Sequence, residues 1–259
     1  MTPRSHARIL YDVLATLMHR EWRQRVAQGK WLTLWMFLEP LLQIFAVAGL
    51  YVAYGRATVA GQEAYMFLGI AIFSFVAFRN LATKPSDAII VSSGLLMYRQ
   101  VHVFDLLLSK WAAESLAYVL LSAIGLTYLS MFEETLKVNA AGFSLAVCVI
   151  LSMSFGITCI LAWARRERPW ITTYFRPVFF AMYVTSGALH PIWDLPESVT
   201  NLLAYNPMDQ VLELLRQSLL FHYVSPLPIS ESYLLLWAFG TLALGMYLVL
   251  KDAERLRSR

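Results

Sequence analysis

Residues 139–163 read NAAGFSLAVCVILSMSFGITCILAW, a stretch without a single Asp, Glu, Lys or Arg. A transmembrane helix needs about 20 mainly apolar residues to cross a hydrocarbon core roughly 30 Å thick. The surface helices of soluble domains are different, because they carry apolar residues on one face only. The stretch therefore predicts a membrane-spanning helix, and the fold depends on how many such stretches accompany it.

The whole composition has the same bias. Of the 259 residues, 58% are hydrophobic and 15% are charged, against about 45–50% apolar and about 25% charged in typical soluble domains. A compact soluble fold of this length cannot bury so much apolar surface, so part of that surface must face lipid. The composition excludes a soluble enzyme and indicates an integral membrane protein.

Further apolar stretches of about spanning length occur along the chain, and they leave no room for a second soluble domain. Together with the first, they cover 31–53, 64–83, 106–131, 139–163, 169–189 and 231–250. We therefore expect a single all-α transmembrane domain over 1–259. It would consist of an interface helix within 1–30, a six-helix membrane region over 31–250 and a cytoplasmic tail over 251–259.

The segment over residues 8–27 is amphipathic rather than continuously apolar. Its apolar side chains recur at helical spacing, opposite polar and basic ones. They are Ile9, Leu10, Val13, Leu14, Leu17 and Met18. A basic amphipathic helix of this kind lies in the membrane interface; the alternative is a surface helix on a soluble core. Because no soluble core follows, we expect the interface helix.

Two connections are too long to be turns. In residues 84–104, Ser86 is expected to cap a short apolar helix. Residues 188–230 hold two apolar runs, 196–205 and 207–221, that are too short to span. These runs predict a re-entrant or interfacial hairpin before the last span.

Two local features of this outer hairpin favour a structural role. Asn206-Pro207 is expected to start a helix, because both residue types are typical of helix N-termini. Glu213 and Arg216 are three residues apart, which is the spacing of an ion pair on one helix face. We expect both features to shape the outer exit.

Lysine and arginine are distributed unevenly along the predicted topology. With both termini in the cytoplasm, 16 of the 21 fall on the cytoplasmic side, whereas Arg56, Lys137 and Arg216 fall on the other. The positive-inside rule therefore predicts a multi-pass bacterial inner-membrane protein with cytoplasmic termini. The net charge of +4 then reflects topology, and we expect no nucleic-acid binding.

Catalytic motifs are absent from the sequence. It contains neither H-E-x-x-H nor G-x-S-x-G. Gly29-Lys30 does not belong to a phosphate-binding loop, because Gln24 and Trp31 occupy the positions of the required Gly and Ser or Thr. A membrane enzyme with a spatially assembled catalytic pair is the alternative class. We expect no catalytic residue, metal or cofactor on this chain, and ATP hydrolysis on a separate polypeptide.

Four stretches together resemble the permease subunits of ABC type-2 polysaccharide exporters, and KpsM-like capsule exporters in particular. They are REWRQRVAQGKWLTLWMFLEP (20–40), SSGLLMYRQVHVFDLLLSKWAAESL (92–116), HPIWDLP (190–196) and YNPMDQVLELLRQSLL (205–220). The resemblance covers essentially the whole chain in order and spacing. One departure is Tyr205, where the family usually has Trp before Asn-Pro.

The resemblance implies an ATP-driven exporter of a lipid-linked acidic capsular polysaccharide. Its implied partners are a second copy of this chain, two KpsT-like ATPase subunits that hold ATP and Mg, a KpsE-like periplasmic co-polymerase and a KpsD-like outer-membrane channel. Export of O-antigen, teichoic acid or another glycan through the same architecture is the closest alternative. A small-molecule ABC exporter is another.

An ionisable residue inside a span is a functional candidate because its charge is costly in lipid. Glu39, beside Pro40, is expected to line the conduit or to pair with a basic residue such as Arg176; a protonated side chain bonded to a neighbouring helix is the alternative. The resemblance makes the inner halves of the first and fifth spans the conduit walls, where aromatic rings can stack on sugars; the alternative for these rings is the interfacial aromatic belt of any membrane protein. The expected conduit residues are Trp35, Phe37, Glu39, Tyr174, Phe175 and Arg176.

Basic residues near the inner mouth suit an acidic glycan or its lipid terminus, with ordinary flanks that contact lipid headgroups as the alternative. They are Arg23, Arg25, Lys30, Arg165, Arg166 and Arg168. The resemblance also implies that the cytoplasmic loop helix docks on the ATPase, whereas otherwise it would rest on the membrane interface. The expected coupling residues are Asp87, Ile89, Ile90, Leu95, Leu96, Tyr98 and Arg99.

Overall fold

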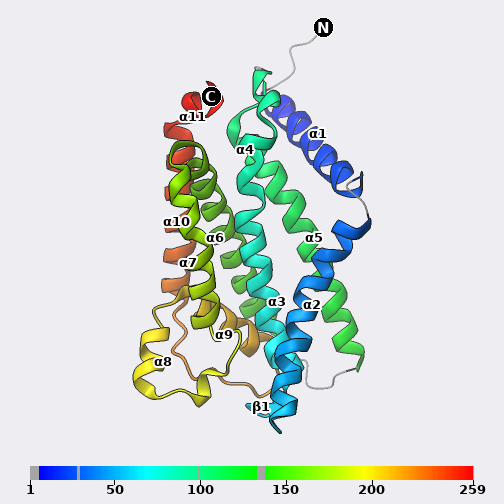
Figure 1. Cartoon of the computed structure of the whole chain (residues 1–259), viewed down its shortest axis with the longest axis vertical. Coiled ribbons are helices and arrows are strands. Elements are labelled where there is room, and N and C mark those ends of the chain that lie inside the picture. The colour runs from blue at the N-terminus through cyan, green and yellow to red at the C-terminus, as the bar shows by residue number, and fades with distance from the viewer. Residues whose placement is uncertain (1–5, 28–29, 99, 133–137, 259) are drawn as a thin grey trace.

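The computed structural model describes residues 6–27, 30–98, 100–132 and 138–258, most of them in helices (Figure 1). The longer helices are α1 (His6–Ala27), α2 (Lys30–Ala53), α3 (Ala64–Thr83), α5 (Val103–Phe132), α6 (Ala140–Glu167), α7 (Thr172–Thr185), α9 (Pro207–Leu219) and α10 (Glu231–Lys251). The shorter ones are η1 (Pro85–Asp87), α4 (Ala88–Val91), η2 (Ser93–Met97), η3 (Pro169–Ile171), η4 (Ile192–Asp194), α8 (Glu197–Leu203) and α11 (Ala253–Ser258). A small antiparallel hairpin, β1 (Thr58–Val59) with β2 (Gln62–Glu63), interrupts the helical pattern.

Four helices among the described residues are long and apolar enough to cross a membrane. They are Ala64–Val91, which joins α3 to α4, and Val103–Met131, Ala140–Glu167 and Glu231–Lys251. The prediction of a helical membrane protein is thereby confirmed. Helices α2 and α7 lie where the other two spans are predicted; α2 has 24 residues, and Phe37–Ala53 is the apolar part of it among the described side chains.

The helix observed at the fifth predicted span, α7, is shorter than the apolar stretch that predicts it. That stretch covers 169–189, whereas α7 has 14 residues, which extend about 21 Å at 1.5 Å per residue. Pro169 begins the 3-10 turn η3 before α7. After α7 the chain turns at Gly187, whose φ of 62° is a conformation that favours glycine. These backbone features, rather than a loss of apolar residues, set the ends of α7.

Helix α6 packs against both α3 and α10. Two glycines allow the backbones of α6 and α10 to come very close. A Cβ at Gly156 would lie 2.5 Å from the backbone carbon of Thr241, and a Cβ at Gly245 would lie 2.3 Å from the carbonyl oxygen of Gly156. At one end of the bundle lie α4 and α11, and at the other lie β1 and α8 (Figure 1). The connection over 84–104 and the C-terminal tail, which are both predicted to be cytoplasmic, therefore lie at the same end of the bundle.

Helix α9 is buried along almost its whole length at the α8 end of the bundle. The Asn206 side chain caps it by accepting a hydrogen bond from the backbone N–H of Met208, 3.0 Å away. Arg216 pairs with Glu213 at 2.5 Å, and both side chains are fully buried. The predicted helix start and the predicted ion pair are both confirmed.

The prediction that Ser86 caps a helix is wrong. The helical course of α3 continues through η1 into α4, and the Ser86 hydroxyl donates to the carbonyl oxygen of Thr83, 2.5 Å away. Because this hydroxyl bonds back along its own helix, it is not used at a helix start. The N-cap position of α4 is Asp87, whose side chain makes no capping bond.

Candidate functional site

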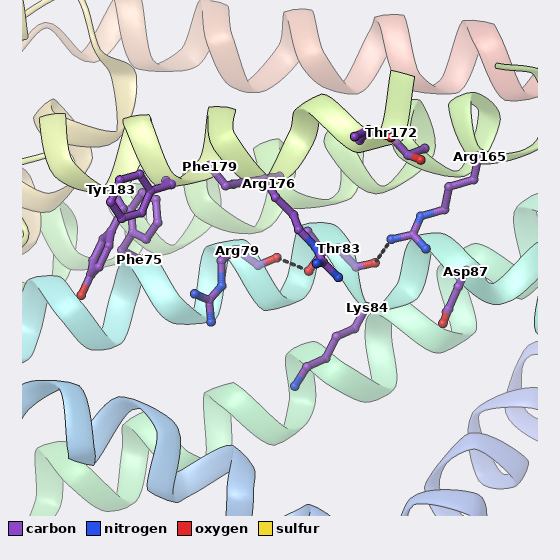
Figure 2. A pocket seen from close by; sticks show the side chains of 12 residues that line it. Phe75, Arg79, Thr83, Lys84, Asp87, Arg165, Thr172, Arg176, Phe179 and Tyr183 are labelled. Atoms are coloured by element: carbon purple, nitrogen blue, oxygen red, sulfur yellow. Dashed lines mark hydrogen bonds between the residues drawn. The ribbon is translucent and has the colours of Figure 1, made fainter. Parts of the chain in front are cut away.

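A cavity of about 790 Å³ lies between α3 and α7, near the end of the bundle that carries α4. Figure 2 shows its lining side chains converging from α3, from Lys84 before the η1 turn and Asp87 at its end, from the end of α6 and from α7. The lining residues are Phe75, Arg79, Thr83, Lys84, Asp87, Arg165, Thr172, Thr173, Arg176, Phe179, Phe180 and Tyr183. We call this cavity the α3–α7 groove.

Helical spacing brings these residues together. Phe75, Arg79 and Thr83 are each four residues apart, so they lie along one face of α3. On α7, Thr172 and Arg176 repeat the same spacing and line the opposite wall. The groove is therefore built from two facing helix stripes, one on the second and one on the fifth predicted span.

One end of the groove is aromatic. The rings of Phe75 and Tyr183 lie 4.7 Å apart between centroids. Phe179 is buried against Phe78, with ring centroids 6.1 Å apart. The Tyr183 hydroxyl donates to Oε1 of Gln43 on α2 at 3.0 Å, so this polar group is paired within the bundle. The aromatic end presents ring surface to whatever enters the groove.

The rest of the groove is basic. Its lining includes four cationic side chains, Arg79, Lys84, Arg165 and Arg176, and one acidic side chain, Asp87. Clustered cations in a recess between low-dielectric helices concentrate a positive potential there. The groove is thus suited to a negatively charged ligand.

Internal carboxylates neutralise only part of this charge. Arg79 pairs with Glu39 of α2, and Lys84 lies 3.4 Å from Glu114 of α5. The groove's own acid, Asp87, pairs with Lys110 of α5 at 2.5 Å. Among the described residues, two of the four groove cations therefore have carboxylate partners.

Arg165 and Arg176 have no carboxylate partner within the described part of the chain. Both side chains point toward Thr83 (Figure 2). Arg165 donates to the Thr83 carbonyl oxygen at 3.5 Å, and its buried Nε has no hydrogen-bond partner among the described residues. Guanidinium groups bind carboxylate or phosphate through two parallel hydrogen bonds, so these two side chains are candidates to bind an anion in the groove.

The predicted conduit residues are only partly brought together. Arg176 lines the groove, but Trp35, Phe37, Tyr174 and Phe175 are not among its lining residues. Trp35 and Tyr174 are exposed on the outside of the bundle, whereas Phe175 packs partly against the main core.

Glu39 pairs with a basic residue, as predicted, but its partner is Arg79 and not Arg176. Glu39 pairs with Arg79 and accepts a second hydrogen bond from Nδ2 of Asn80 at 3.3 Å. The reason is proximity, because α2 packs directly against α3, and α7 supplies the opposite wall of the groove.

The predicted basic mouth is also divided. Arg165 lines the groove, whereas Arg23, Arg166 and Arg168 do not. Arg23 is exposed on α1 and Arg168 is exposed at the end of α6. The side chains of Arg25 and Lys30 lie outside the described residues.

Among the predicted coupling residues, Ile89 and Leu96 do not form an exposed docking face. Both are buried in a core cluster with Leu17 of α1 and Phe155 of α6, and Leu95 packs against the same cluster. Apolar side chains of this short connection are thus covered by the chain itself.

The exposed part of the same connection consists of other side chains. Ile90 and Tyr98 are exposed, as are Val91 and Met97, which the sequence analysis did not select. Asp87 faces the groove, and Arg99 lies outside the described residues. The predicted contact with an ATPase can therefore involve only these exposed side chains of the connection among the described residues.

Sequence reasoning missed several groove residues. Arg79 and Lys84 are among the 16 basic residues that the predicted topology places on the cytoplasmic side, and Phe75, Thr83 and Tyr183 are not among the predicted site residues. A signal was present, because Arg79 lies inside the apolar stretch 64–83 and therefore met the same criterion as Glu39.

Comparisons with known proteins agree with this architecture. The sequence profile of the ABC-2 type transporter family matches residues 12–220. Two Escherichia coli proteins, each named polysialic acid transport protein KpsM, are each 24% identical to this chain over 233 residues, which is 90% of this chain and 90% of theirs. The family match covers most of the chain, including both walls of the groove. The chain therefore belongs to the ABC-2 type transporter family and is a multi-pass membrane permease rather than an enzyme.

Proposed function

We propose that this chain is the permease subunit of an ATP-driven exporter that moves an acidic, lipid-linked polysaccharide across the bacterial inner membrane. The observation that carries the proposal is the α3–α7 groove, in which Arg165 and Arg176 lack carboxylate partners among the described residues. A carboxylate of the glycan or a phosphate of its lipid terminus would complete their hydrogen bonding. The aromatic rings at the far end suit the apolar faces of sugars.

The names of the two related proteins point to the same cargo class, because both are described as transporting polysialic acid, an acidic glycan. In this proposal α2, α3, α5, α6, α7 and α10 are the six spans of a single transmembrane domain, with both termini in the cytoplasm. The short helix α7 would then cross a locally thinned or protein-lined part of the bilayer.

The proposal also includes partners. A second copy of this chain would complete the conduit, and two KpsT-like ATPase subunits would bind ATP and Mg. The exposed side chains of the α4–η2 connection, Ile90, Val91, Met97 and Tyr98, would contact those subunits. KpsE-like and KpsD-like partners would carry the polymer onward.

The test is deletion of the gene followed by location of the cell's acidic polysaccharide. We expect lipid-linked polymer to accumulate in the cytoplasm and the cell surface to lose it. Complementation with Arg176→Ala should leave export low, while the variant still inserts in the membrane and co-purifies with its ATPase. Arg56→Ala is the matched control, because Arg56 pairs with Asp194 on the exposed surface far from the groove.

Two outcomes would redirect the proposal. Normal export by Arg176→Ala would remove the groove from the transport path. An intact acidic capsule in the deletion strain, together with altered lipopolysaccharide or drug sensitivity, would keep a permease and replace its cargo.

A further inference from the structure

We propose that Glu39 is an internal counter-ion that competes with an anion in the α3–α7 groove for the guanidinium of Arg79. Glu39 would therefore be a positioning residue that sets how tightly the groove holds its cargo. This inference rests on the proposed function, since it concerns the same groove.

Arg79 belongs to two sites at once. Its side chain lines the groove between α3 and α7, and its Nη2 bonds to Oε1 of Glu39 on α2. A guanidinium has five N–H donors in a fixed fork, so a second oxyanion can share it with Glu39 or replace Glu39. Arg79 is thus placed to be exchanged between an internal carboxylate and a ligand.

Glu39 has a second hydrogen-bond donor besides Arg79. Its Oε2 accepts a hydrogen bond from Nδ2 of Asn80 at 3.3 Å. Asn80 is itself buried and also donates to the Tyr118 hydroxyl on α5 at 2.7 Å. If Arg79 moved toward the groove, Glu39 would keep one hydrogen-bond donor, so the exchange does not leave a bare carboxylate.

The pair is neither fully buried nor fully exposed. The side chain of Glu39 is 22% exposed and that of Arg79 is 30% exposed. Ion pairs in such partly solvated settings are weak enough to be replaced, unlike fully buried pairs. The Glu39–Arg79 pair is therefore suited to exchange.

Because other cations line the same groove, the competition between Glu39 and a ligand for Arg79 affects how tightly the groove binds an anion. An oxyanion bound by Arg165 and Arg176 would meet Arg79 as a third cation of the same groove. With Glu39 in place the third cation is partly neutralised, and binding is moderate. Moderate binding suits transport, because a conduit must hold its cargo strongly enough to admit it and weakly enough to release it.

The experiment measures binding to the full-length permease, co-purified with its ATPase and embedded in nanodiscs of zwitterionic phosphatidylcholine. One probe is a fluorescently labelled oligomer of sialic acid, which offers carboxylates. The other is a short-chain phosphatidic acid, which offers a phosphate. The comparison of the two probes separates a glycan from a lipid headgroup as the source of the oxyanion.

We expect Glu39→Gln to tighten binding of the preferred probe by about fivefold, the range of a partly exposed ion pair, and to steepen its salt dependence. Glu39→Asp keeps the charge and should shift affinity less. The double variant Glu39→Gln/Arg79→Gln should lose the gain, because the released guanidinium is gone. Glu197→Gln, an exposed acid on α8, is the matched control and should bind as the wild type does.

Unchanged or weaker binding by folded Glu39→Gln would overturn the inference, since a carboxylate that only braces α2 against α3 does not oppose the ligand. Should Glu39→Gln fail to fold, Arg79→Gln decides the matter. Weaker probe binding by that variant supports the inference, and unchanged binding overturns it.

Failure of the inference can be told apart from failure of the proposed function. If Arg176→Ala weakens probe binding while Glu39→Gln leaves it unchanged, the groove binds anions and only the role of Glu39 is lost. If neither variant alters binding, the groove is not the site.

Discussion

The two ends of the bundle surround their arginines differently. Near α8, Arg216 is fully buried and each nitrogen of its guanidinium is bonded, to Glu213 at 2.5 Å, to the Phe67 carbonyl oxygen at 3.2 Å and to the Gly187 carbonyl oxygen at 2.8 Å. In the α3–α7 groove, Arg165 and Arg176 lack a carboxylate partner in the ranges that the structure describes. An arginine with a complete set of partners holds helices together, whereas one without them has donors left for a ligand.

The largest expected effect comes from removing the buried ion pair between Arg216 and Glu213. Arg216→Ala leaves Glu213 as a buried carboxylate without its cation, which costs about 3–5 kcal/mol in stability. The variant should show a much lower thermal unfolding midpoint in detergent, or fail to accumulate in the membrane.

The matched control for that variant removes both charges. Glu213→Gln/Arg216→Met keeps an acceptor for the Tyr223 hydroxyl, which donates to Glu213 at 2.6 Å. It should recover most of the lost stability. A single variant as stable as the wild type would show that the buried network does not hold α9 in place.

The second effect separates function from stability in the groove. Arg165→Ala removes a side chain whose hydrogen bond to protein is the 3.5 Å contact with the Thr83 carbonyl oxygen. Stability should change by less than about 1 kcal/mol, as for other weakly paired, partly exposed charges. Export should fall about tenfold, the loss that corresponds to one charge-assisted hydrogen bond. A large drop in unfolding midpoint together with normal export would reverse the comparison.

Local features of this contrast were predictable from the sequence. The Asn206 cap and the Glu213–Arg216 pair join residues two or three positions apart, and such contacts follow from helix geometry alone. The apolar stretches likewise indicated where the long helices lie, because a continuous apolar run needs no knowledge of its neighbours.

Features that join distant segments were not predictable in the same way. Glu39 and Arg79 are 40 residues apart in sequence, and their pairing depends on which helices become neighbours. The burial of Ile89 and Leu96 depends on where α1 and α6 lie. A single sequence does not show which helices pack against each other. It therefore indicated charged candidates within spans but not their partners.

Asp209 is the exception that tests the comparison. Asp209 lies on α9, at the same end of the bundle as Arg216, and is fully buried. Neither of its carboxylate oxygens has a hydrogen-bond partner among the described residues. It does not line the groove, so we interpret it as a stability cost. Asp209→Leu, which replaces the unpaired carboxylate by an apolar group with the same branched connectivity, should raise stability by about 1 kcal/mol.

The measurement is the unfolding midpoint of Asp209→Leu beside its export activity. We expect a higher midpoint and wild-type export, with Asp194→Asn as an exposed acidic control. A loss of export by a stable Asp209→Leu would mean that unpaired groups at both ends of the bundle serve transport.

The smallest effect is a pH dependence at the turn after α7. Burial lowers the pKa of His190 below its ordinary value of 6.5, and the nearby positive charge of Arg216 lowers this pKa further. The unfolded chain therefore binds a proton at His190 more readily than the folded chain does. The contribution of His190 to the free energy of unfolding is fully present above pH 6.5. It declines as the pH falls from there toward the lowered pKa of the folded state.

Unfolding midpoints measured from about pH 8 to about pH 5 should therefore fall more steeply for the wild type than for His190→Gln, which cannot be protonated in this range. Equal slopes would show that His190 titrates alike in both states. In Glu213→Gln/Arg216→Met the histidine loses its cationic neighbour, so the wild-type slope should shrink without vanishing, because burial, the larger cause, is still present. That residual slope separates the effect of burial from the effect of the Arg216 charge.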